Sequence, residues 1–232
     1  QTYKNFELII IDDGSTDNSK VICKNFSKKD NRIIFLDNNH IGLTRSLNKA
    51  LEIASGHYIA RQDADDVSLP NRFEKQIKWF LKDKKRVLCG TNCKILTQNN
   101  EYKNNRSLKF SNSGIKKKLE YSNCFVHSSI MFSNKSAKIF KNYDENLEFA
   151  QDYDLWWKLS TLGQVGNLKE KLVILRNRKN SVSVKNENNQ TLNFIKSCLK
   201  FYAYNKKILG VNDHKEIIFY EKHDLTKNKI KI

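Results

Sequence analysis

Two clusters of aspartates in the first third of the chain have the residue types and spacing for cation and phosphate chemistry. Each cluster directly follows a short apolar run: Asp12-Asp13 the first, and Asp63-Asp65-Asp66 the second. Carboxylates so close together repel one another unless a cation offsets their charge. The usual solution on a loop is a hard divalent ion, Mg²⁺ or Mn²⁺, held by one or two carboxylates plus substrate phosphates. The alternatives are a solvated acidic turn and a cap for the helix that follows.

The segments around these clusters have the alternating pattern of an α/β fold. Apolar runs predict short strands at 6–11, 32–36 and 58–60. Helical periodicity predicts helices between them, the first with Val21, Ile22 and Phe26 buried. Right-handed crossovers make such strands parallel and bring their carboxyl ends to one edge of the sheet. We therefore expect both acidic clusters to line one crevice.

The rest of the chain is expected to extend this layer and to end in a tail. Further strands are predicted at 87–96, 123–132 and 171–176, and helices from Pro70 and at 152–162, with an exposed basic excursion at 102–119. Beyond residue 183 the chain is rich in Asn and Lys, with one amphipathic stretch around Leu192, Ile195, Leu199 and Tyr202. The expected division is a catalytic domain at 1–183 and a basic helical tail at 184–232.

Composition narrows the class of protein. The 232 residues include 39% hydrophobic residues, enough for a core, and carry a formal net charge of +17, most of it after residue 100. Such a charge suits an anionic partner, although a solvated basic surface is the alternative. Five cysteines without a C-x-x-C pair predict buried reduced thiols and a cytoplasmic location. The chain opens at Gln1 with neither an initiator Met nor a signal peptide, which predicts a segment of a longer protein.

Four ordered segments resemble the motifs of family-2 glycosyltransferases, which have the GT-A fold. They are FELIIIDDGSTDNS (6–19), IGLTRSLNKALEIASGHYIA (41–60), YIARQDADDVSLPNRFEKQ (58–76) and FAQDYDLWWKL (149–159). The resemblance covers about residues 1–183. It implies a Rossmann-like α/β domain with a mostly parallel sheet flanked by helices, whose first strand is expected to precede Gln1 and to be missing here.

The resemblance also implies a role for each acidic residue. Asp13, with Asp12 beside it, would contact the nucleotide base of a nucleoside-diphosphate-sugar donor, UDP-linked by this resemblance. Asp63 would face the ribose and the diphosphate. Asp65 would be the principal metal ligand, with Asp66 as its neighbour.

By the same resemblance Asp152 is the general base, which removes a proton from the acceptor hydroxyl as that oxygen attacks the anomeric carbon. Its position equally fits a helix cap. The chain departs from the family pattern at Gln151, where a Glu is usual. It also lacks the His that often follows the last strand, and Arg178 is the expected diphosphate contact there. For His127 a structural role is favoured over a functional one.

These observations favour a metal-dependent inverting glycosyltransferase acting on a glycan or a lipid-linked saccharide. The basic second half would hold it at the anionic inner face of a membrane without spanning it. The alternatives are a nucleotidyltransferase, a degenerate non-catalytic relative and a basic nucleic-acid-binding module, although nucleic acid is not an expected partner of a transferase. Nucleic-acid binding would weaken steeply with salt and would not need a divalent metal.

Overall fold

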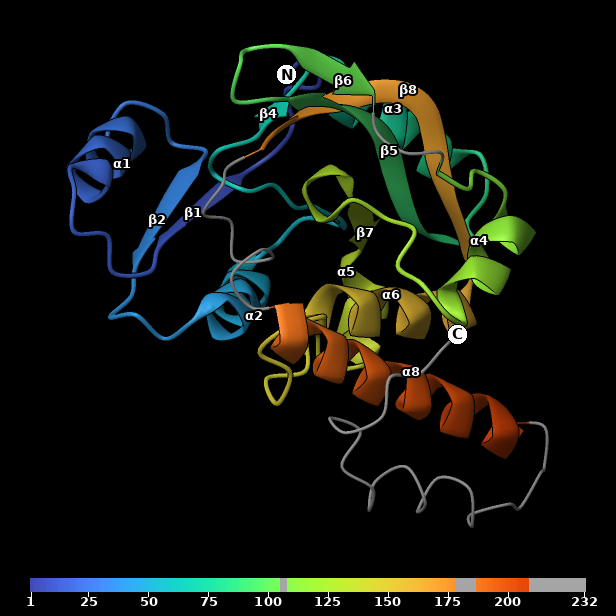
Figure 1. Ribbon diagram of the computed structural model, residues 1–232. Coiled ribbons are helices and arrows are strands. Elements are labelled where there is room, and N and C mark those ends of the chain that lie inside the picture. Colours follow the sequence, from blue (N-terminus) through green and yellow to red (C-terminus); the bar gives the residue numbers. More distant parts are fainter. Residues whose placement is uncertain (105–107, 178–186, 209–232) are drawn as a thin grey trace.

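The computed structural model describes residues 1–104, 108–177 and 187–208. Two sheets lie side by side with helices packed around them (Figure 1). A two-stranded sheet carries the first acidic cluster, and a larger curved sheet carries the second. The α/β fold class expected from the sequence is confirmed.

The smaller sheet is formed by β1 (Leu8–Asp12) and β2 (Ile33–Asp37), which are parallel, with Leu8 opposite Ile33. Helix α1 (Ser19–Ser27) connects the two strands, and α2 (Leu43–Ile53) follows β2. The expectation that α1 buries its apolar residues is wrong, because Val21, Ile22 and Phe26 are 58%, 52% and 56% exposed. Two strands about 5 Å apart offer a narrower surface than the face of a helix about 10 Å across, so the apolar stripe of α1 stays uncovered.

Within the described residues, the larger sheet has the order β3-β7-β5-β8-β4, with β6 paired to β5. Its strands are β3 (Tyr58–Ala60), β4 (Val67–Ser68), β5 (Arg86–Leu96), β6 (Tyr102–Asn104), β7 (Met131–Ser133) and β8 (Gln164–Arg176). Only the long pair β5 and β8 is parallel among the pairings described for this sheet. The sequence pattern predicted that β3 would extend the parallel pair of β1 and β2. This prediction is wrong, because β3 pairs antiparallel with β7. An apolar run indicates a covered strand but not the direction of its neighbour.

Strand β5 divides two apolar clusters because its side chains alternate between the faces of the sheet. Leu88 packs with the large cluster that includes Trp156 of α6 (Gln151–Leu162). Cys89 points to the opposite face and packs with Phe80 of α3 (Arg72–Leu81). Helices α3 and α6 thus cover opposite faces of the strand that lies behind the candidate site.

The segment between β5 and α6 is less exposed and less extended than the sequence predicted. It contains α4 (Asn112–Leu119), whose Ile115 and Leu119 are fully buried, where an exposed excursion was expected. The predicted strand at 123–132 is mostly a loop with the short 3-10 helix η1 (His127–Ser129), and only its end belongs to β7. Helix α5 (Asn134–Ile139) follows at once.

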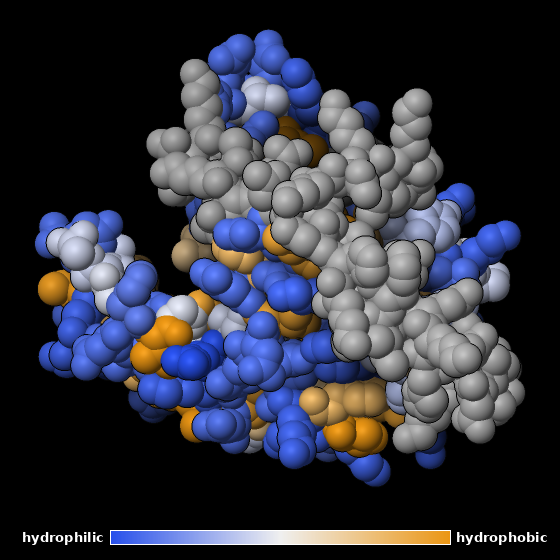
Figure 2. Space-filling model, turned by 60° about the horizontal axis from the view of Figure 1, so that its bottom comes forward, coloured by the Kyte–Doolittle hydropathy of each residue, from blue (hydrophilic) through white to orange (hydrophobic). Residues whose placement is uncertain are grey.

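Helix α8 (Glu187–Ile208) lies beneath α6 and packs against it (Figure 1). Its buried face carries Ser197 and Phe201, whereas Tyr202, which belongs to the predicted amphipathic stretch, is 48% exposed. The expected domain boundary at 183/184 lies outside the described residues. No helix in the described ranges is long and apolar enough to cross a membrane. Where Figure 2 is coloured by hydropathy, most of the surface is hydrophilic, with separate apolar patches.

Candidate active site

The loop after β3 presents the second acidic cluster and is tied down by a buried arginine. Arg61 is 7% exposed, and its Nη1 donates to Asp63 Oδ2 at 2.6 Å while Nη2 pairs with Asp63 Oδ1. Ser128 joins this pair, since its hydroxyl donates to Asp63 Oδ2 at 2.8 Å and accepts from the Asp63 N–H at 3.0 Å. A bidentate pair of this kind fixes both the position and the plane of the carboxylate.

Asp65 and Asp66 follow on the same loop, where Asp66 is partly buried. Asp66 Oδ1 accepts a hydrogen bond from the Arg176 N–H at 2.9 Å, which brings the end of β8 to the acidic loop. Burial, together with the charges of Asp63 and Asp65, raises the pKa of Asp66 despite the hydrogen bonds that it accepts. This carboxylate group is therefore incompletely compensated, a state that a bound cation would relieve.

A second buried arginine supports the loop from behind. Arg72 of α3 is fully buried and donates from Nη2 to the carbonyl oxygens of Arg61 at 2.9 Å and Ile130 at 2.8 Å. Its Nη1 donates to Ser68 Oγ at 2.7 Å and its Nε to Gln76 Oε1 at 3.0 Å. Burial lowers the pKa of this guanidinium to about 9. These bonds hold the backbone that leads into the acidic loop.

Asp152 lies in the first turn of α6 and is half-buried. The N-cap of α6 is Ala150, with φ +56°, so Asp152 does not cap the helix. Asn123 Nδ2 donates to Asp152 Oδ2 at 2.9 Å and orients the carboxylate. Burial raises the pKa of Asp152, and the positive charge of Arg61 acts in the opposite direction. A carboxylate with a raised pKa is suited to accept a proton.

His127 packs against α6, the helix that carries Asp152, and is an uncharged packing residue. Its Nε2 lies 3.2 Å from the Tyr143 hydroxyl, and its ring packs edge-on against Trp156 at 5.7 Å. Burial, reinforced by the charge of Arg61, lowers the pKa of His127 well below its usual value. Its contacts are those of a structural residue, and it begins η1 instead of lying within a strand.

The first acidic cluster organises the turn after β1 and the start of α2. Asp12 Oδ1 accepts from the Gly14 and Ser15 N–H groups at 3.2 and 2.9 Å. Asp13 accepts from the Ile41 N–H at 2.9 Å and the Gly42 N–H at 2.8 Å, one on each carboxylate oxygen. Although burial opposes it, these two bonds lower the pKa of Asp13, so the carboxylate is held charged at the start of α2.

The structure thus places the predicted residues in two groups. Asp63 and Asp66 are linked through Ser128, and Asp152 is held separately by Asn123, whereas the hydrogen bonds of Asp12 and Asp13 stay with the smaller sheet and the start of α2. Arg178 lies outside the described residues. No three His, Cys, Asp or Glu side chains converge as a ready metal site in the described ranges.

The sequence analysis singled out neither Arg61 nor Asn123 as a site residue. Arg61 had a usable signal, since residues two apart along an extended segment face the same side, and Arg61 lies two before Asp63. Asn123 had no such signal, because it lies 29 positions before Asp152, the residue that it contacts.

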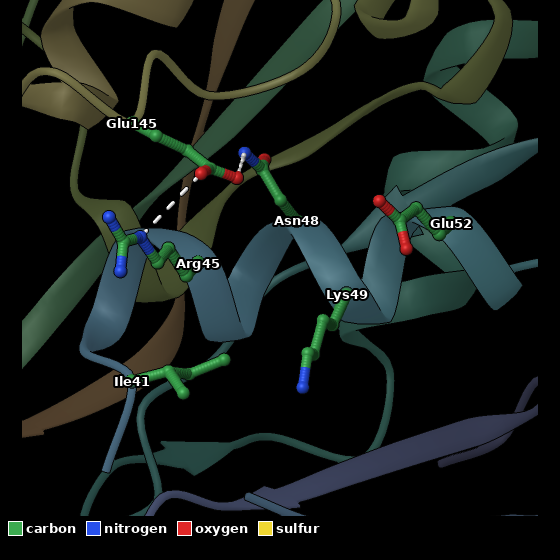
Figure 3. A pocket seen from close by; sticks show the side chains of 6 residues that line it. All are labelled: Ile41, Arg45, Asn48, Lys49, Glu52 and Glu145. Carbon is green, nitrogen blue, oxygen red and sulfur yellow. Dashed lines mark hydrogen bonds and ion pairs between the residues drawn. The ribbon is translucent and has the colours of Figure 1, made fainter. Parts of the chain in front are cut away.

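A separate pocket of about 280 Å³ lies on the outer side of α2 (Figure 3). Arg45 and Asn48 both point to Glu145, while Lys49 points away from it. The lining residues are Ile41, Arg45, Asn48, Lys49, Glu52 and Glu145. None of them is a predicted site residue, although the Ile41 N–H binds Asp13.

Comparison with known proteins places this arrangement in a family. The model of the family "Glycosyl transferase family 2" matches residues 1–140. An uncharacterized glycosyltransferase of Haemophilus influenzae is 32% identical over 89% of this chain and 68% of its own length. An uncharacterized glycosyltransferase of Methanocaldococcus jannaschii is 39% identical over 67% of this chain and 54% of its own length. The O-antigen biosynthesis glycosyltransferase WbnJ of Escherichia coli is 35% identical over 68% of this chain and 62% of its own length. The chain thus spans about half to two thirds of the length of each of these relatives.

Solved structures share the fold. Residues 1–349 of S. aureus TarS, in complex with UDP-GlcNAc, align with a TM-score of 0.60 at 18% identity, over 76% of this chain and 51% of that one. The mannosyltransferase PcManGT of Pyrobaculum calidifontis, in complex with GDP-Man and Mn²⁺, aligns with a TM-score of 0.56 at 14% identity, over 87% of this chain and 55% of that one. At these identities the likeness concerns the fold alone.

Proposed function

The chain belongs to glycosyltransferase family 2, and we propose that it transfers a sugar from a nucleoside diphosphate sugar to a hydroxyl of a glycan or lipid-linked saccharide with inversion. The observation that carries this proposal is an acidic loop whose Asp63 is held by the buried Arg61, together with the half-buried Asp152, whose pKa is raised, in the first turn of α6. The names of similar proteins support it, since UDP-GlcNAc is bound to TarS and one relative acts in O-antigen biosynthesis.

In this proposal Asp152 is the general base. Its carboxylate takes the proton of the acceptor hydroxyl while that oxygen forms a bond to the anomeric carbon. The bond from the anomeric carbon to the diphosphate breaks at the same time, on the opposite face of the sugar. Asn123 keeps the carboxylate in place, and the lowered pKa of His127 makes that imidazole a poor proton acceptor.

Asp65 and Asp66 would hold a divalent cation, Mn²⁺ or Mg²⁺. Oxygen donors on a loop suit either ion, and the raised pKa of Asp66 indicates a group that lacks positive charge. A bound cation would offset the charge that develops on the departing diphosphate. One or two carboxylates suffice when substrate phosphates complete the coordination, which fits the lack of a three-residue metal cluster in the described ranges.

The donor would bind between the two acidic groups. Asp13 accepts from the Ile41 and Gly42 N–H groups and from the Ser46 hydroxyl, and a carboxylate has about four lone-pair sites, so one remains for a nucleobase N–H. Asp12 shapes the turn beside it, and Asp63 would face the ribose and diphosphate, since its side chain remains 45% exposed. Arg178, for which the structure describes no position, stays the proposed diphosphate contact.

A basic surface would bring the enzyme to an anionic membrane that carries its acceptor. The last turn of α4 has three consecutive lysines, Lys116, Lys117 and Lys118. Basic residues near an anionic bilayer each contribute about 1 kcal/mol to binding. Peripheral attachment of this kind does not require a spanning helix.

Calorimetric titration with UDP and with GDP, each with and without Mn²⁺, tests the proposal. We expect saturable binding of one nucleotide that requires the metal, and loss of that requirement together with most of the affinity in Asp65→Ala. Asp30→Ala is the matched control, because Asp30 is an exposed aspartate paired with Arg32. Metal-independent binding by the unaltered protein, or wild-type behaviour of Asp65→Ala, would remove the metal site from the proposal.

A further inference from the structure

One buried guanidinium joins the two ends of the acidic loop, residues 61–66. Arg72 Nη2 donates at 2.9 Å to the carbonyl oxygen of Arg61, where the loop begins. Its Nη1 donates at 2.7 Å to Ser68 Oγ, just after the loop ends. Because Arg72 is fully buried in α3, this link belongs to the rigid base of the loop. It does not reach the aspartates between the two ends.

The side chain of Gln62 spans the acidic loop above this base. Its Nε2 donates to the carbonyl oxygen of Asp66 at 2.8 Å, and its Oε1 accepts from the Ser68 hydroxyl. Arg72 Nη1 lies 3.5 Å from the same Oε1. These partners fix the orientation of the amide, since a carbonyl can only accept a hydrogen bond and a guanidinium can only donate one. Gln62 therefore links the beginning of the loop to its end.

The surrounding sheet does not depend on this link. Strands β3 and β4, which flank the loop, pair with β7 and β8 through their own backbone groups. Gln62 is exposed, and an exposed amide can exchange its hydrogen bonds for bonds to water at little net cost. The contacts of Gln62 thus set the shape of the loop and contribute little to the stability of the fold.

Gln62 holds the backbone of an aspartate whose carboxylate is held by a second contact. The Asp66 carbonyl accepts from Gln62, and Asp66 Oδ1 accepts from the Arg176 N–H at 2.9 Å. The Asp66 N–H donates to the Asp63 carbonyl at 3.2 Å and closes the turn. Asp63, Asp65 and Asp66 lie within four residues, and their like charges repel one another. The link through Gln62 opposes the opening of the loop that this repulsion favours.

We propose that Gln62 is a positioning residue for the cation: by joining the Asp66 carbonyl to the Ser68 hydroxyl, it holds the carboxylates of the acidic loop at the spacing that the cation binds. The inference rests on the proposed function, in which Asp65 and Asp66 hold Mn²⁺ or Mg²⁺. A loop that becomes ordered only on binding weakens the binding, and a loop ordered beforehand avoids that cost. A glutamine with a purely structural role would affect the thermal stability of the protein but not its affinity for Mn²⁺.

The affinity for Mn²⁺ in the presence of saturating UDP, measured from the electron paramagnetic resonance signal of free Mn²⁺, tests this proposal. Gln62→Met keeps the length of the side chain and removes its hydrogen bonds. We expect this variant to bind Mn²⁺ about three- to tenfold more weakly, which is the net contribution of a hydrogen bond, at an unchanged Tm. Gln98→Met is the matched control, because Gln98 is exposed in the turn after β5, and it should bind Mn²⁺ like the wild type.

Hydrogen exchange in the metal-free protein, followed by mass spectrometry, tests the order of the loop without UDP. The amides of residues 62–67 should exchange about three- to tenfold faster in Gln62→Met than in the wild type, since the open loop becomes more populated. The rest of the chain should exchange at the wild-type rate. Gln62→Ala is a second variant, for which we expect the same two results.

Wild-type Mn²⁺ affinity in both Gln62 variants would overturn the proposal, and so would unchanged exchange of the loop amides. Weaker Mn²⁺ binding that comes with a large fall in Tm would assign Gln62 to the fold and would also contradict it. Failure of the proposed metal site is a separate result, in which the wild type itself binds no Mn²⁺ with UDP. That result would remove the site and this inference together.

Discussion

Replacement of Asp154 by alanine should destabilise the protein strongly by loosening α8 from α6. The Asp154 carboxylate is fully buried, and Lys158 Nζ donates to its Oδ2 at 2.5 Å. Ser197 Oγ of α8 donates to Oδ1 at 3.1 Å and accepts from Trp157 Nε1 at 3.0 Å. One carboxylate thus holds two donors, one from each helix.

The size of the effect follows from this burial. Removing one partner of a buried ion pair costs about 3–5 kcal/mol. Lys158 is 16% exposed and can turn toward water, which favours the lower end, about 3 kcal/mol. For a domain of this size each kcal/mol lowers Tm by about 2–4 °C, so Asp154→Ala should lower it by about 6–12 °C.

Thermal unfolding followed by near-ultraviolet circular dichroism, with urea unfolding beside it, measures this change. Lys75→Ala is the matched control, since its pair with Glu170 is exposed and should contribute less than about 1 kcal/mol. Ser197→Ala should fall between the two, at about 1–3 kcal/mol, because it leaves the Trp157 N–H unpaired. If Asp154→Ala unfolds within about 1 kcal/mol of the wild type, the network does not anchor α8 and the reasoning is wrong.

Three further outcomes are expected. Asp152→Asn should keep nucleotide binding but lower the rate of sugar transfer by at least about 10², measured as kcat with a saturating donor; near-normal turnover would assign the proton to another group. Because burial raises the pKa of Asp152 above 3.8, the base is protonated as the pH falls through that raised value, so the acid limb of kcat/KM should lie above pH 3.8. Gly42→Ala should lower the stability by about 1–3 kcal/mol. Gly42 has φ +90° and open space around its missing Cβ, so only backbone strain opposes the change, and an unaltered Tm would argue against that strain.

The sequence by itself determined the local elements and the chemical groups at their ends. The apolar runs correctly located β1, β2, β3 and β5, and the helical stripe from Leu43 located α2. The two aspartate clusters necessarily follow strands β1 and β3, because they come just after the corresponding apolar runs in the sequence. Such features depend on neighbours within a few residues, and local periodicity reports them directly.

Only the tertiary structure decided what those elements meet. The antiparallel pairing of β3 with β7 joins residues more than 70 positions apart, and nothing within either strand encodes it. The exposure of Phe26, the buried face of α8 and the contact of Asn123 with Asp152 likewise depend on which distant surfaces come together. For Arg61 the sequence supplied the carboxylate two residues away, but only the tertiary structure buried the guanidinium and added Ser128 to the pair. Burial is a property of the assembled fold, and it is burial that makes one charge influence another strongly.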